Sequence, residues 1–317
     1  MIIQQCVVFY KGEGRMAKPI IRVKNLTKDY GNKRGVFNIN LQVSEGECYG
    51  FLGPNGAGKT TTIRHMMGFS KPQFGKCRIL GKDCWKRAAE LKKSIGYLPG
   101  EVSLPVGVTG EGFLKMILKM HGYSGYTKCQ ELLERFELDT GKKIREMSLG
   151  EKRKVAIAAA FMHDPKILVL DEPTSGLDPV MQQEFIKFIK EEKVKGKTIF
   201  LSSHIFSEVD AVCDRIAIIK TGEIVSEFRS EELRQTYDNI YVVKFETKES
   251  YEAFKKKKYI LTADSEERLK VKVRVPAEQL QAFIEDMAPL HIKSFHQVKF
   301  SLEDYFMDFY KSEEVQI

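Results

Sequence analysis

The stretch of sequence that decides the fold reads Gly53-Pro54-Asn55-Gly56-Ala57-Gly58-Lys59-Thr60. Its glycines leave room for many backbone N–H groups to approach a polyphosphate at once. Lys59 can then reach the terminal phosphates, and the hydroxyl of Thr60 can ligate Mg²⁺. The stretch therefore predicts a phosphate-binding loop that takes ATP together with Mg²⁺.

The residues on either side of this loop support the prediction. Residues 47–52 predict a strand that enters the loop, and residues 61–67 predict a helix that leaves it and ends near Gly68. A helix in this place directs its positive end at a bound anion, so we add Thr61 to the expected ATP-binding residues. The competing interpretation is a glycine-rich turn that binds nothing.

Two carboxylates follow a second apolar run at residues 167–170. The run is typical of a strand that is buried on both faces of a parallel sheet. At the end of that strand Asp171 can hold Mg²⁺ through water, and Glu172 can act on an attacking water. A third run, at residues 198–203, ends at His204, which can contact the γ-phosphate. The alternatives are a surface acidic pair and an ordinary surface or core histidine.

In kind and order these motifs resemble those of the ATP-binding subunits of ABC transporters, over residues 20–228. The resemblance implies an α/β fold of the P-loop NTPase type, with an ABC-type helical subdomain at about residues 101–160. It further implies that Asp171 is the magnesium-associated carboxylate, Glu172 the catalytic carboxylate and His204 the switch histidine.

The resemblance also implies residues that act across a dimer. Residues 147–151 correspond to the family's signature loop, in which Ser148 and Gly150 meet the ATP held by the other protomer. This chain has Leu149 and Glu151 where the family usually has a second glycine and a glutamine.

Two further residues take their roles from the same resemblance. Asp178 belongs to the loop that communicates with the other ATP site. Tyr30 corresponds to the aromatic residue that stacks on adenine; the alternative is an ordinary aromatic at a strand end.

The clearest departure from the family pattern lies at Gly100. The family places there a glutamine that touches Mg²⁺ and relays to the membrane partner. Glu101 could supply a carboxylate one residue later, since oxygen ligands suit Mg²⁺. A loop without any metal ligand is the open alternative.

The family's mechanism implies partners. Each ATP is sandwiched between the Lys59 loop of one protomer and the Ser148 loop of the other, so we expect a homodimer to form on ATP binding. Separate integral membrane subunits would sense this closure, through a surface at residues 101–143; the alternative for the apolar residues of this segment is core packing of the helical subdomain. We therefore expect ATP-driven export, of drugs or antibiotic peptides, at the cytoplasmic face of the plasma membrane. The alternative is a soluble ABC-type mechanical ATPase that acts on ribosomes, DNA or cofactor assembly.

Composition narrows the class of protein. No apolar stretch of the 317 residues approaches 18 residues in length, so no membrane span is predicted. The net charge of +8 suits peripheral contact with anionic lipid headgroups, and the alternative is a soluble basic surface without such a partner. No helix-turn-helix, aromatic RNA-binding signature or zinc finger is present, and we expect no nucleic-acid partner.

The two ends of the chain predict different structures. Residues 1–19 are expected to be a disordered N-terminal extension. Residues 229–317 predict an accessory α+β domain, because apolar residues at 269, 271, 273 and 275 alternate with basic ones. With a helix predicted near residues 280–287, the order βαββαβ indicates a small ferredoxin-like fold. A tail of this kind after one ATPase domain resembles the ATPases of bacterial drug-export and self-resistance transporters.

Overall fold

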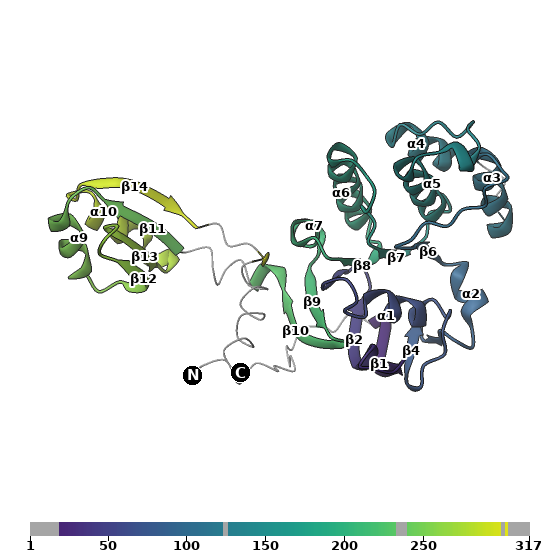
Figure 1. The fold of residues 1–317 in the computed structure, drawn as a ribbon, viewed down its shortest axis with the longest axis horizontal. Coiled ribbons are helices and arrows are strands. Elements are labelled where there is room, and N and C mark those ends of the chain that lie inside the picture. The colour runs from purple at the N-terminus through teal and green to yellow at the C-terminus, as the bar shows by residue number, and fades with distance from the viewer. Residues whose placement is uncertain (1–18, 123–125, 233–239, 299–301, 304–317) are drawn as a thin grey trace. The chain divides into compact units, whose positions relative to one another are not determined.

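The computed structural model describes residues 19–122, 126–232, 240–298 and 302–303, which form two compact units divided between Phe228 and Arg229 (Figure 1). Each unit is described by itself. The expected disorder of residues 1–19 falls outside the described residues except at Pro19. That residue is not disordered, because it is the first residue of a strand.

The first unit is built around a six-stranded sheet in the order β10-β9-β3-β8-β7-β6. The neighbouring strands β9, β3, β8, β7 and β6 pair in parallel. Every residue of β3, β7 and β8 is buried, as expected for a sheet covered on both faces. Because parallel strands end at one edge, the loops after β3, β7 and β8 lie side by side. The strands are β3 (Cys48–Leu52), β6 (Ile95–Leu98), β7 (Ile167–Asp171), β8 (Thr198–Ser203), β9 (Arg215–Lys220) and β10 (Glu223–Arg229).

A second, antiparallel sheet in the order β2-β1-β4-β5 shares a hydrophobic core with the first. Helix α1 (Lys59–Met66) inserts Ile63 and Met66 into this core, and both side chains are almost fully buried. This packing anchors the helix that follows the phosphate loop. The strands are β1 (Pro19–Asp29), β2 (Gly35–Ser44), β4 (Phe74–Ile79) and β5 (Lys82–Asp83).

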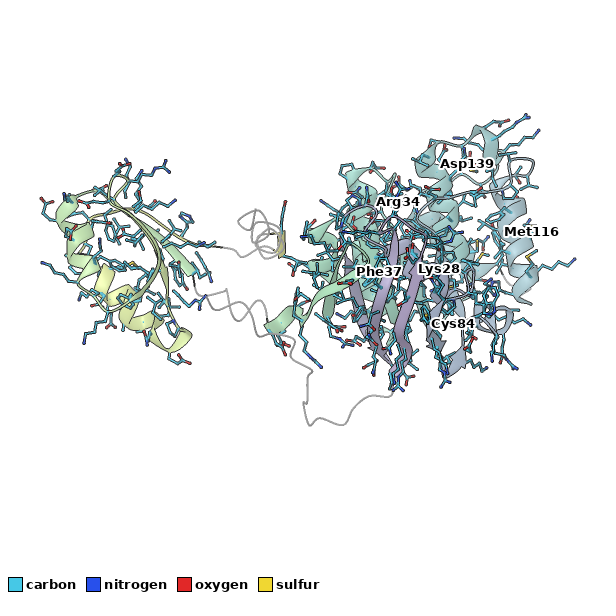
Figure 2. All side chains as sticks on the ribbon, turned by 60° about the horizontal axis from the view of Figure 1, so that its bottom comes forward. Lys28, Arg34, Phe37, Cys84, Met116 and Asp139 are labelled. Carbon is cyan, nitrogen blue, oxygen red and sulfur yellow. The ribbon has the colours of Figure 1, made fainter. Side chains whose placement is uncertain are left out.

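The predicted helical subdomain contains α3 (Gly110–His121), α4 (Thr127–Arg135), the 3₁₀ turn η1 (Ile144–Glu146) and α5 (Leu149–Phe161). Figure 1 shows these helices gathered together, and α5 packs on α3, α4 and β6. On α3 the side chain of Met116 is exposed (Figure 2). The remaining helices of this unit are α2 (Ala88–Lys92), α6 (Pro179–Val194) and α7 (Phe206–Val212). In the part of the chain that the structure describes, no helix is long and apolar enough to cross a membrane.

The second unit is an antiparallel sheet in the order β12-β13-β11-β14, with its own core. Along β13, Val271 and Val273 are fully buried whereas Lys270 and Arg274 are exposed, which is the alternation of a strand with one covered face. The elements are β11 (Ile240–Phe245), α9 (Lys248–Lys255), β12 (Ile260–Ser265), β13 (Lys270–Arg274), η2 (Ala277–Gln279), α10 (Leu280–Met287) and β14 (Ile292–Gln297).

Candidate functional site

The loop between β3 and α1 has a shape that only glycine permits at two positions. A Cβ atom on Gly53 would lie 2.3 Å from the carbonyl oxygen of Ile219. Gly58 has φ of +109°, and a Cβ there would lie 2.8 Å from a methyl carbon of Val36. Both residues are therefore required by the turn itself as well as by access to a ligand.

Lys59 is the first residue of α1, and its side chain is only 5% exposed. Its ammonium group donates to the carbonyl oxygens of Gly53 at 2.5 Å and Pro54 at 3.1 Å. It also lies 3.0 Å from a carboxylate oxygen of Glu172. The ammonium group is thus held between the first residues of the phosphate loop and the carboxylate of Glu172. Of the other predicted loop residues, Ala57 is buried, Thr61 is half-buried, and the exposed ones are Pro54, Asn55, Gly56 and Thr60.

Asp171 lies at the end of β7 and is fully buried. Burial raises the pKa of its carboxyl group, and hydrogen bonds from the hydroxyls of Ser202 and Thr60 oppose that rise in pKa. The Ser202 hydroxyl lies 2.5 Å from Oδ1, whereas Oδ2 has no hydrogen-bond partner among the described residues.

The unpaired Oδ2 of Asp171 and the hydroxyl of Thr60, which also acts on this carboxyl group, are oxygen ligands of the kind that suits Mg²⁺. No cluster of three or more His, Cys, Asp or Glu residues suited to a metal occurs among the described residues. None is needed for Mg²⁺, which usually takes one or two carboxylates, waters and substrate phosphates.

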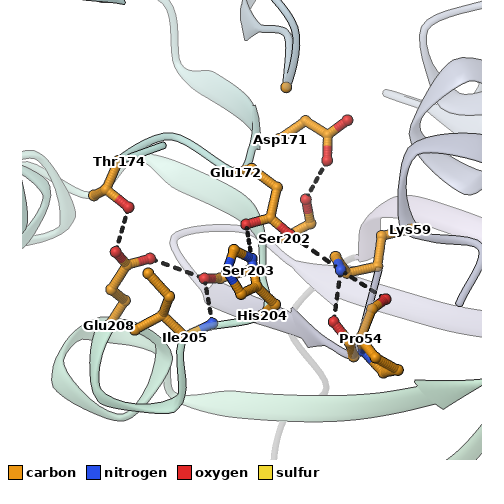
Figure 3. Close-up of polar contacts among 12 residues, drawn as sticks. Pro54, Lys59, Asp171, Glu172, Thr174, Ser202, Ser203, His204, Ile205 and Glu208 are labelled. Carbon is orange, nitrogen blue, oxygen red and sulfur yellow. Dashed lines mark hydrogen bonds and ion pairs between the residues drawn. The ribbon is translucent and has the colours of Figure 1, made fainter. Parts of the chain in front are cut away.

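Glu172 is placed between Lys59 and His204 (Figure 3). One carboxylate oxygen faces the Lys59 ammonium, and the other lies 2.7 Å from Nδ1 of His204. Its backbone has φ of +47°, a conformation that costs a residue other than glycine about 1–3 kcal/mol. The strain persists because its N–H donates to the carbonyl oxygen of Ser202 at 3.0 Å, which fixes this turn against β8. Strain of this kind is concentrated at functional sites.

A second buried carboxylate, Glu208 on α7, was missed by sequence reasoning. It accepts hydrogen bonds from the hydroxyls of Thr174 and Ser203, the latter at 2.8 Å (Figure 3). Burial raises the pKa of Glu208. The hydrogen bonds tie the loop that follows Glu172 to the loop that carries His204. The only signal in the sequence was an acidic residue close after His204 at the start of a short helix.

The signature loop forms the start of α5. Ser148 is the N-cap: its hydroxyl accepts from the N–H of Glu151 at 3.2 Å, and the Glu151 carboxylate accepts from the N–H of Ser148 at 2.8 Å. This capping box works with glutamate or glutamine, so the departure at position 151 preserves the helix start. Hydrogen bonds from Lys142 and from the Ser148 N–H lower the pKa of Glu151 to about 2. Leu149 is 62% exposed.

Tyr30 and Asp178 take no part in the hydrogen bonds and ion pairs that hold Lys59, Asp171 and Glu172 among the described residues. Tyr30 is 57% exposed, and its ring lies 5.4 Å from the Lys28 ammonium. Asp178 caps α6 by accepting from the N–H groups of Val180 at 3.1 Å and Met181 at 3.0 Å. These bonds lower the pKa of Asp178.

Glu101 is exposed, and it makes no hydrogen bond or ion pair with the described residues around Asp171. The neighbouring Gly100 is the residue that adjoins this carboxylate, because a Cβ there would lie 3.2 Å from Asp171 Oδ2. A magnesium role for Glu101 remains a prediction.

The fold and the loop together define a P-loop nucleotide-binding domain, and comparisons identify its family. The chain belongs to the ABC transporter family of ATP-binding proteins and is an ATPase. The family matches residues 36–175.

Two relatives illustrate the likeness. The bacitracin transport ATP-binding protein of Bacillus licheniformis is 38% identical over 219 residues, 68% of this chain and 72% of that protein. An uncharacterized ABC transporter ATP-binding protein of Bacillus subtilis (strain 168) is 32% identical over 297 residues, 92% of this chain and 96% of that one.

Solved structures agree on the fold. The ATP-binding subunit of an ABC transporter superposes with a TM-score of 0.62 and 28% identity, covering 69% of this chain and 93% of that one. A dimeric ATP-binding cassette in a post-hydrolysis state, bound to ADP and Pi, superposes with a TM-score of 0.60 and 25% identity. The match covers 66% of this chain and 98% of that one.

Proposed function

We propose that this chain hydrolyses ATP to power the export of a drug or antibiotic peptide through separate membrane subunits, at the cytoplasmic face of the plasma membrane. The observation that carries the ATPase mechanism is the placement of Glu172 between Lys59 and His204. Export is supported by relatives named for bacitracin transport and, in Streptomyces coeruleorubidus, for daunorubicin resistance. These names do not favour the alternative of a soluble mechanical ATPase.

The chemistry follows from the positions of the side chains. Bound Mg²⁺, held by Asp171 and Thr60, would neutralise charge on the phosphates. When ATP occupies the loop, Lys59 exchanges its contact with Glu172 for the terminal phosphates. The carboxylate is then free to orient the attacking water and accept its proton, while His204 keeps its other oxygen in place.

A homodimer completes the site. Ser148 and Gly150 of one protomer would contact the ATP held by the other, and Asp178 would communicate between the two sites. Tyr30 would stack on adenine, for which its exposed ring is available.

The second unit is proposed to be a ferredoxin-like domain, supported by its βαββαβ order and its antiparallel sheet. No nucleic-acid partner is expected.

The test is Glu172→Gln, because the amide keeps the shape of the side chain but cannot accept the water's proton. Light scattering with Mg-ATP should show a dimer that persists in the variant but is transient in the wild type, while phosphate release stops. Glu223→Gln, at an exposed position on β10, is the matched control and should behave as wild type. Equal phosphate release from Glu172→Gln and wild type would refute the role of Glu172.

Export is tested separately. The chain should co-purify with an integral membrane protein encoded in the same cell. ATP hydrolysis stimulated by nucleic acid would favour the soluble alternative instead.

A further inference from the structure

Arg153 on α5 is a buried arginine to which the proposed mechanism assigns no role. Its side chain is 2% exposed, and it donates to three backbone carbonyl oxygens. Nε lies 2.8 Å from the oxygen of Ser175, Nη1 2.7 Å from that of Pro99, and Nη2 2.5 Å from that of Gly100. One guanidinium group therefore joins the helix α5 to two loops that are distant in the sequence.

The charge of this side chain is unusual for such a buried place. Burial lowers the pKa of Arg153, while the negative charges of Asp171 and Glu172 act in the opposite direction. Within the described ranges no carboxylate comes close enough to form an ion pair with it. A buried cation is costly unless it is hydrogen-bonded, and here each of the three guanidinium nitrogens donates to one carbonyl oxygen. Arginine suits this task because its planar fork directs several donors at fixed angles.

The first of the two loops adjoins the proposed magnesium site. Gly100 stands where the family resemblance places a glutamine, and it lies against Asp171 Oδ2. The bond from Arg153 goes to the main-chain carbonyl of Gly100, so it does not depend on any side chain at this position.

The second loop adjoins both the proposed catalytic carboxylate and the signature loop. The N–H of Ser175 donates to the carbonyl oxygen of Glu172 at 3.2 Å. A Cβ on Gly150 would lie 3.1 Å from the carbonyl oxygen of Gly176. Arg153 therefore holds a loop that touches the start of its own helix.

We propose that Arg153 is a positioning residue that couples the loop beside Asp171 and the loop after Glu172 to the helix that begins at Ser148. A shift of either loop moves the signature loop with it, because the three bonds converge on one rigid group. The ATP site of a protomer and the signature loop that it presents to its partner thus change together. This inference rests on the proposed function.

The test compares Arg153→Lys with Arg145→Lys, a matched change at an exposed residue of η1. Lysine keeps the charge but cannot bridge three carbonyl groups in a fixed fork. In the Glu172→Gln background, Arg153→Lys should reduce the ATP-dependent dimer at least tenfold, while binding of a fluorescent ATP analogue to the monomer changes less than twofold. In the wild-type background, kcat should fall at least tenfold with little change in KM. Arg145→Lys should have no effect.

The outcomes separate this inference from the proposed function. If Glu172→Gln alone forms no dimer, the proposed function fails. If Glu172→Gln dimerises equally well with and without Arg153→Lys, the coupling role of Arg153 is refuted. A purely structural role would lower thermal stability and ATP affinity together, and that result would also refute it.

If Arg153→Lys does not fold, hydrogen exchange on the Glu172→Gln protein decides the question. Addition of Mg-ATP under conditions in which the protein remains monomeric should slow exchange at residues 99–101 and at residues 149–152 together. Slowing in the first segment alone would overturn the proposal.

Discussion

Substitutions at Ser148 can separate a structural role, the capping of a helix, from a functional role, contact with the ATP of the partner protomer. The structure shows it as the N-cap of α5, and the proposed dimer gives its hydroxyl a second task at the partner's ATP. The perturbation is Ser148→Ala, with Ser148→Asn as the matched variant, because asparagine caps helices about as well as serine does.

The two roles predict effects of different size. Loss of a serine N-cap costs about 1 kcal/mol, or about a fivefold rise in the local opening of the first turn. A hydrogen bond to a charged phosphate contributes about 1.5–3 kcal/mol, and the homodimer contains two. Loss of both therefore weakens the ATP-dependent dimer by about 3 kcal/mol or more, which is more than a hundredfold.

Two assays read these effects independently. Hydrogen exchange at the Glu151 amide, the group that the Ser148 hydroxyl caps, reports the helix start. Light scattering with Mg-ATP in the Glu172→Gln background reports the dimer. Ser148→Ala should impair both, whereas Ser148→Asn should restore the exchange rate but leave the dimer weak. A dimer of wild-type strength in Ser148→Ala would refute the role of Ser148 across the interface.

The remaining predictions concern the affinity for ATP, the Mg²⁺ requirement of hydrolysis and the pH dependence of stability. Tyr30→Ala should weaken ATP binding about fivefold, since ring stacking contributes about 1 kcal/mol, with little loss of turnover at saturating ATP; an unchanged affinity measured by titration would make Tyr30 an ordinary aromatic. Glu101→Ala should raise the Mg²⁺ concentration needed for half-maximal hydrolysis, and no change would discard Glu101 as a ligand. Because the pKa of Glu151 is lowered to about 2 by Lys142 and Ser148, its capping contribution is complete above its ordinary pKa and is lost as pH falls towards 2. Thermal unfolding of Glu151→Gln should therefore depend less on pH in this acidic window than that of the wild type.

Several elements were predictable because their signals are local. The strand expected at residues 47–52 is β3, Cys48–Leu52, and the run at residues 167–170 is β7, with Asp171 at its end. The helix expected from residue 61 begins earlier, at Lys59, because Gly58 in the left-handed conformation is its N-cap. Helix starts inside such loops depend on backbone conformation, which residue patterns indicate only approximately.

The loop at Gly100 shows what residue patterns do not reveal. The sequence left two alternatives there, a metal ligand at Glu101 or no metal ligand in the loop, and the role of Glu101 stays a prediction. The structure adds that Gly100 lies against Asp171 and that its carbonyl oxygen accepts a hydrogen bond from Arg153. No residue pattern near position 100 could reveal a partner 53 residues away.

Residue patterns alone were enough to predict the phosphate loop, the buried parallel strands and the polar residues at their ends. These features depend on contiguous residues, because a phosphate cradle is built from successive N–H groups and a buried strand from successive apolar side chains. Which side chains meet became known from the folded chain: Lys59 contacts Glu172, Glu208 contacts Thr174, and Arg153 contacts two loops. Those contacts arise because parallel pairing brings distant loops to one edge of the sheet, where buried polar groups must find partners across long stretches of chain.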